Sequence, residues 1–157
     1  MLLREGEQRA EHALPTRLSI AVPVALGSDE ARARALAARW LGSYTTWMGP
    51  LYPRLLSERF GMRRQVQAMI GAAAMGRDPE LPASVEPLAR EVTLFGTYAE
   101  AGEAIAAWFA AGADRLNLCL PPGCAEEEMS EIVEVVARSL NSDVVAHGDD
   151  SSRSPRA

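Results

Sequence analysis

Lysine is absent from this sequence, and all 16 of its basic residues are arginines. Without lysine, the chain cannot form a Schiff base with a carbonyl compound, and it cannot supply the lysine of a phosphate-binding loop. Its glycines are scattered and do not form a glycine-rich phosphate motif. These absences exclude pyridoxal-dependent catalysis and Walker-type nucleotide hydrolysis.

Cysteine and histidine are scarce. Cys119 and Cys124 lie in the stretch CLPPGC, which lacks the C-x-x-C spacing of thioredoxin-like sites, and with two distant histidines they cannot assemble four zinc ligands. We expect one buried and one loop cysteine, and no metal. His12 and His147 lie near the two ends, in segments expected to be poorly ordered, so neither is expected to act as a general base. The low cysteine count and the lack of a secretory signal predict a cytoplasmic protein.

Long apolar runs are missing too, since none approaches the roughly 20 residues of a membrane helix. The chain has 16 basic and 21 acidic residues, a net charge of −5. It has no electrostatic reason to approach nucleic acid or an anionic membrane, and we expect neither as a partner. Its 157 residues suffice for one domain, but a complete (β/α)8 barrel needs at least about 200.

The first expected strand is the nearly continuous apolar run from Leu18 to Leu26, which is typical of a buried parallel strand. Pro23 weakens this interpretation because proline has no amide hydrogen to donate. Ser28 is the expected N-cap of a helix that begins near Asp29 and ends between residues 41 and 44.

An aromatic bend follows, with Tyr44, Trp47 and Tyr52 around a glycine and two prolines. These rings are expected either in the core or, for Trp47 and Tyr52, along a pocket. Beyond the bend we expect helices over residues 53–60 and 62–75, then a loop with one short helix over 76–90.

The clearest local signal is Thr97-Tyr98-Ala99-Glu100, which has the form of a capping box and predicts a helix over 98–111. Gly112 follows as its C-terminal residue, and a strand over 116–120 comes next. Glu126, Glu127 and Glu128 are expected to open a last helix, where acidic residues favour the N-terminus. Its predicted apolar face consists of Met129, Ile132, Val133, Val136 and Leu140. Residues 148–157 are expected to form a disordered tail.

This order of elements predicts a helix-rich α/β fold with a βαβ crossover between the strands at 18–26 and 116–120. Two parallel strands leave unpaired edges on both sides. Further strands are therefore expected in residues 91–95 and 144–146, or else from another chain.

Several short pieces, in this order, resemble the C-terminal region of the bacterial luciferase-like oxidoreductases (luciferase-like monooxygenases), and most closely their deazaflavin-dependent branch. They are residues 28–34, 47–52, 55–56, 60–61, 94–97 and 110–118. The resemblance covers nearly everything from about residue 2 to residue 140. It implies an incomplete (β/α)8 TIM barrel over residues 1–147, in which the strands at 18–26 and 116–120 are the seventh and eighth and residues 29–90 form a helical insertion.

The resemblance implies hydride transfer or monooxygenation with a deazaflavin coenzyme or FMN in the parent family. The strands that carry the family's catalytic positions are missing, so no catalytic residue is expected, and the chain alone is expected to be inactive and to hold no cofactor. Barrel sites lie at the carboxyl ends of strands, which places Gly27 and Ser28 at that edge. The substrate-pocket residues predicted by position are Trp47, Tyr52, Pro121, Pro122 and Gly123.

The alternative function is a non-catalytic interaction module that self-associates or completes a partner barrel. Both hypotheses involve a partner, which is either a second copy or a chain that supplies the missing strands. The sequence leaves the substrate, the choice of cofactor and the oligomeric state open.

Overall fold

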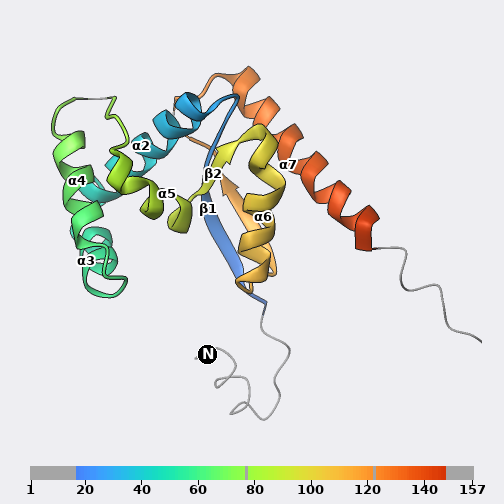
Figure 1. The fold of residues 1–157 in the computed structure, drawn as a ribbon, viewed down its shortest axis with the longest axis horizontal. Helices are drawn as coiled ribbons and strands as arrows, with labels where there is room; N and C mark the ends of the chain where they lie inside the picture. Colours follow the sequence, from blue (N-terminus) through green and yellow to red (C-terminus); the bar gives the residue numbers. More distant parts are fainter. Residues whose placement is uncertain (1–16, 77, 122, 148–157) are drawn as a thin grey trace, which may run out of the picture.

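Three parallel strands form one sheet in the order β2-β1-β3, as the computed structural model shows for residues 17–76, 78–121 and 123–147 (Figure 1). The described elements, in chain order, are β1 (Ser19–Gly27), α2 (Glu30–Thr46), α3 (Leu51–Glu58), α4 (Arg63–Ala73), η1 (Ala83–Val85), α5 (Glu86–Val92), β2 (Leu94–Thr97), η2 (Tyr98–Glu100), α6 (Ala101–Ala110), β3 (Arg115–Cys119) and α7 (Glu126–His147). The chain is thus a helix-rich α/β protein with a small parallel sheet.

β1 is the central strand, and its two halves pair on opposite sides. Ser19–Pro23 pairs with β3, whereas Val24–Gly27 pairs with β2. Pro23 lies where the pairing changes sides, so its missing amide hydrogen interrupts neither ladder in mid-course. No described strand pairs with the other side of Ser19–Pro23 or with the outer edge of β3.

The expected parallel pair is confirmed, because Ile20 lies opposite Leu116 and Val22 opposite Leu118. The sheet order nevertheless differs from that of consecutive barrel strands, in which β2 would lie between β1 and β3. β2 instead lies on the far side of β1. Its bounds also differ slightly from the strand expected within residues 91–95.

Helices cover both faces of the sheet (Figure 1). Alternate β1 residues point to opposite faces, as in any strand. Val22, Val24 and Leu26 join α6 and α7 in one apolar cluster, while Ala25 joins Phe95 and the insertion helices α2–α5 in the other. Together the two clusters bury both faces of β1 from Val22 onward, as its apolar run predicts.

α2 begins at Glu30, one residue later than expected. Asp29, not Ser28, is the N-cap, and its carboxylate accepts a hydrogen bond from the Arg32 amide at 2.7 Å. Asp29 therefore satisfies the helix N–H group that Ser28 was expected to satisfy. The expected helices over 53–60 and 62–75 occur as α3 and α4.

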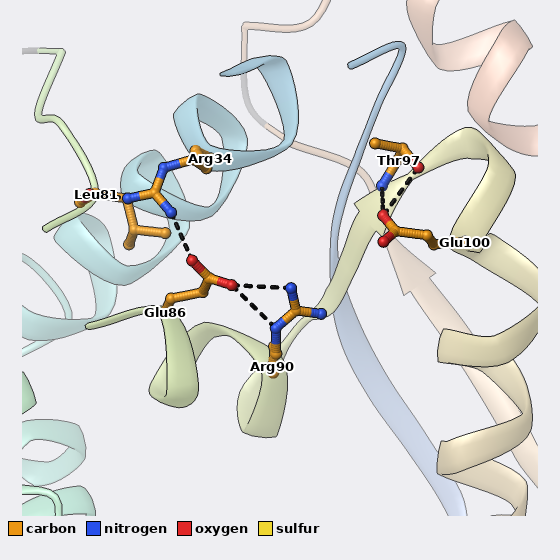
Figure 2. Close-up of polar contacts among 6 residues, drawn as sticks. All are labelled: Arg34, Leu81, Glu86, Arg90, Thr97 and Glu100. Atoms are coloured by element: carbon orange, nitrogen blue, oxygen red, sulfur yellow. Dashed lines mark hydrogen bonds and ion pairs between the residues drawn. The ribbon is translucent and has the colours of Figure 1, made fainter. Parts of the chain in front are cut away.

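α5 and the segment before it are held to α2 by a charged network that Figure 2 shows. The Arg34 guanidinium donates to Glu86 at 2.7 Å and to the Leu81 carbonyl at 2.6 Å. Arg90 donates to the other Glu86 oxygen, at 2.9 Å, from one turn further along α5. The hydrogen bond from Arg90, followed by the contribution of Arg34, holds the pKa of Glu86 below its usual value.

The capping box is confirmed. The Thr97 amide donates to the Glu100 carboxylate at 2.7 Å and its hydroxyl does so at 2.9 Å (Figure 2). The helix over 98–111 occurs as η2 followed by α6, and Gly112 has a positive φ of 104°.

α7 differs from its prediction in face and in length. Ile132 and Val136 are buried as expected, but Val133 and Leu140 are exposed and Val135 is buried in place of Val133. The strand expected over 144–146 is wrong, because α7 continues to His147 without a glycine or proline to end it. The predicted tail, 148–157, lies outside the described residues. Across the described ranges, no helix is long and apolar enough to cross a membrane.

The close approach of α2 to the end of β1 yields the first prediction. A Cβ on Gly27 would lie 2.4 Å from the Ala33 backbone nitrogen, so Gly27→Ala forces backbone atoms apart and should destabilise the protein by about 1–3 kcal/mol. Gly71→Ala is the matched control, because that helical glycine has no atom within 4 Å of an added Cβ; it should stabilise by about 0.5–1 kcal/mol. Urea unfolding measures both. A Gly27→Ala variant as stable as the wild type would contradict the close packing.

Candidate functional site

The carboxyl ends of β1 and β3 form the best-defined candidate site. In open α/β sheets, ligands bind beyond the carboxyl ends of neighbouring strands whose following helices cover opposite faces. α2 follows β1 and packs in one apolar cluster, whereas α7 follows β3 and packs in the other. The crevice between β1 and β3 therefore has the required topology, and we refer to it as the carboxyl edge.

A salt bridge spans this edge from α2 to α7. Arg32 donates through Nε and Nη2 to the two Glu128 oxygens, each at 2.5 Å, and both side chains are less than one third exposed. A two-point arginine–carboxylate contact fixes the geometry of both groups. The hydrogen bond to Arg32 is the main reason that the pKa of Glu128 lies below its usual value, and the same bond raises the pKa of Arg32.

Cys124 lies beside this salt bridge and is held in its neutral form. Burial, followed by the hydrogen bond and charge of Glu128, raises the pKa of the Cys124 thiol to about 11. A reactive cysteine needs a lowered pKa and an electropositive setting. Cys124 is therefore not equipped as a nucleophile, and it is free of any disulfide, as is Cys119.

The structure describes four of the five residues predicted for the pocket. Pro121 is buried at the carboxyl edge, and Gly123 follows it in the β3–α7 loop with a φ of 78°. Trp47 caps the other end of α2, about 25 Å along a helix of 17 residues, and 85% of it is exposed. Pro122 lies outside the described residues.

Tyr52 belongs to an aromatic cluster with two rings of α2. Its ring meets Tyr44 edge-on at 4.9 Å, and Tyr44 stacks on Trp40 at 5.8 Å. The Trp40 indole donates to the Val24 carbonyl at 2.9 Å, just beyond the last β1 residue that pairs with β3. Burial, then the nearby Tyr52 and Cys119, raises the pKa of Tyr44.

Sequence reasoning missed Trp40 and Arg39. Trp40 sits in the middle of α2, and its only signal in the sequence is that a helical tryptophan needs a partner for its indole N–H. Arg39 donates to Asp78 at 2.9 Å and lies 3.5 Å from the position that a Gly123 Cβ would take. It reaches both the 76–79 loop and the β3–α7 loop, and nothing in its local sequence indicates either contact.

A groove of about 640 Å³ lies between α2 and the 76–79 loop, with Trp47 and Arg39 in its wall. Arg39 connects this groove to the carboxyl edge, since its guanidinium also lies near Gly123. The hydroxyls of Ser43 and Thr46 that line the groove already donate to α2 carbonyls. A ligand in this groove would therefore contact the Trp47 ring but would find no hydroxyl without a hydrogen-bond acceptor.

The carboxyl edge does not fit a flavin or deazaflavin phosphate. A phosphate needs free helix N-termini or free arginines. Here the first turn of α7 carries Glu126, Glu127 and Glu128, that of α2 carries Glu30, and Arg32 is held by Glu128. Among the described residues, no group of three or more side chains could hold a metal ion.

No protein-family model, curated protein or solved structure matches this chain.

The Arg32–Glu128 salt bridge generates a stability prediction. Glu128→Gln removes a charged hydrogen-bond acceptor from a half-buried partner and should cost about 1–2 kcal/mol in the free energy of unfolding at pH 7. Because the folded pKa of Glu128 lies below its unfolded value, the contribution is complete above about pH 5 and is lost as pH falls through the folded pKa. Urea unfolding across this range should show the two proteins converge in acid. Glu127→Gln, one residue earlier, should change stability by less than about 0.5 kcal/mol, and an equal loss in both variants would refute the role of Arg32.

Thiol alkylation tests the environment of Cys124. In a Cys119→Ser background, the remaining thiol should react with iodoacetamide at pH 8 roughly two orders of magnitude more slowly than a free cysteine, because its thiolate fraction is so small. Mass spectrometry of timed samples gives the rate. Addition of Glu128→Gln should accelerate the reaction by removing the neighbouring negative charge. Ordinary reactivity of Cys124 in the folded protein would contradict the assigned environment.

Proposed function

We propose that this chain is one part of a luciferase-like oxidoreductase, which gains its activity when further strands complete the sheet. The observation that carries the proposal is the staggered pairing of β1. One side of Ser19–Pro23 and the outer edge of β3 have no described strand beside them. Parallel sheets in α/β proteins are normally covered on both faces and extended at their edges.

The direct parallel pairing of β1 and β3 supports their assignment as neighbouring strands of the proposed barrel, although helices of this chain cover both faces of β1, whereas in a complete barrel they cover the outer face alone. As neighbouring parallel strands in a five-residue register, they can serve as its seventh and eighth strands. β2 pairs only beyond Pro23, so it leaves the amino-terminal half of β1 open for a sixth strand. The outer edge of β3 is open in the same way for a first strand. The short β2 then belongs to the insertion and not to the barrel wall.

The cofactor is assigned to the completed assembly. FMN or a deazaflavin coenzyme supplies hydride transfer in the parent family, but the carboxyl edge of this chain is filled by its own carboxylates and by Arg32. We therefore place phosphate binding and catalysis on the additional strands. The part that falls to this chain is to close the sheet and to contribute the edge at Gly27, Ser28 and Pro121.

The second candidate is a non-catalytic interaction module. It is favoured by the exposed apolar side chains of the segment 47–60, which include Trp47, Leu51 and Phe60. In that case, cofactor binding would be absent from any assembly that contains the chain, whereas the oxidoreductase proposal requires it there.

Hydrogen exchange of the isolated chain tests the open edge. The β3 amides that do not face β1 should exchange at nearly the unfolded rate, while those inside α2 around Leu36 stay protected and serve as the internal reference. Titration with FMN and with a deazaflavin coenzyme, followed by cofactor fluorescence, should show no saturable change. Full protection of β3 in the dilute monomer would refute the open edge. Saturable cofactor binding would refute the assignment of the cofactor to strands outside this chain.

A further inference from the structure

The outer face of α3, formed by Leu51, Arg54, Leu55 and Glu58, is a helix surface without a described partner. Leu51 is 69% exposed and Leu55 39%, whereas Leu56, on the inner face, is buried against α2 and α4. The four residues recur at i, i+3, i+4 and i+7, the spacing by which a helix meets a second helix. They line a shallow groove together with Arg59.

Apolar side chains continue at both ends of this helix. Trp47 and Met48 precede it and are 85% and 52% exposed, and Phe60 follows it at 60%. Single exposed hydrophobic residues are ordinary, but several within one short segment indicate a binding surface. The core does not need these side chains, because Leu56 and Tyr52 already anchor α3.

The charges on the outer face are complementary to one another. Arg54 donates to Glu58 at 3.0 Å within the same helix, and both side chains are more than half exposed. Such an exposed pair stabilises a helix by only about 0.3–0.5 kcal/mol. Arg54 and Glu58 lie two residues before and two residues after position 56. Two antiparallel copies of α3 whose axes cross at the level of that position therefore bring each Arg54 opposite the Glu58 of the other copy. A two-fold interface needs a surface that is complementary to itself, and this face is.

We propose that the outer face of α3 is a homodimer interface, in which a second copy of this chain packs Leu55 against its equivalent, covers Leu51 with the segment that follows the partner's α3, and exchanges Arg54–Glu58 pairs. This inference is independent of the proposed function, because the interface lies on the insertion and leaves the edge of β3 open. It identifies the self-association surface without assigning any catalytic role to it.

Sedimentation over a range of concentrations tests the apolar part of the interface. The wild type should associate reversibly, and Leu51→Glu with Leu55→Glu should abolish association without changing the far-UV circular dichroism, because both leucines are exposed. Val133→Glu is the matched control, since it places the same charge on an exposed apolar position of α7. A wild type that stays monomeric at its highest soluble concentration would overturn the proposal, as would association that survives the double leucine substitution.

Charge-reversal variants distinguish a role of Arg54 and Glu58 in the interface from a role within α3 alone. Arg54→Glu alone and Glu58→Arg alone each place like charges across both symmetry-related contacts and should weaken dimerisation by roughly tenfold or more. An equimolar mixture of the two single variants places opposite charges at both contacts and should restore association as a heterodimer. The pair within α3 remains broken in that mixture, so a purely local role of Arg54 and Glu58 predicts no rescue. Absence of rescue would overturn the antiparallel arrangement.

Discussion

The burial of β1 on both faces is the constraint on which the rest of the structure depends. Its alternating side chains belong to two apolar clusters, and its two halves pair with different strands. Val22, Val24 and Leu26 carry the larger side chains toward α6 and α7, while the small Ala25 and Gly27 allow α2 to approach closely on the other face. α2 packs directly on this strand, while α6 and α7 pack on each other and cover its opposite face.

The salt bridge between Arg32 and Glu128 explains why the carboxyl edge is structural in this chain. It connects two helices that cover opposite faces of the sheet, and it occupies the place where many α/β proteins bind an anion. Burial, together with the same carboxylate, raises the pKa of Cys124 and keeps its thiol protonated. A site so filled stabilises the fold, and under our proposal the chemistry belongs to strands that this chain does not contribute.

Local signals predicted local structure well. The Thr97–Glu100 capping box, the apolar run of β1 and the glycine after α6 depend on residues within a few positions of one another, and all three are confirmed. The predicted cap at Ser28 was wrong by one residue because serine and aspartate are both good N-caps and only the chain geometry chooses between them.

Contacts between residues far apart in the chain could not be predicted from the sequence. Arg32 and Glu128 are separated by 96 positions, and the Trp40 indole meets a carbonyl in another element. The face of α7 was misassigned at Val133 and Val135 because both valines flank the buried Ile132–Val136 stripe, and only the packing against the sheet decides which of them is covered. The placement of β2 on the far side of β1 likewise has no local signal in a four-residue strand.

Pro23 also limits how the sheet can grow. On the open side of β1, an incoming strand must stop where β2 begins, and the residue at that boundary is the one that cannot donate an amide hydrogen. The unpaired side of β1, Ser19–Pro23, is therefore five residues long, roughly 17 Å of extended chain. β2 thus sets the length of the strand that can be added, and a longer strand would have to bend away from the sheet or displace β2.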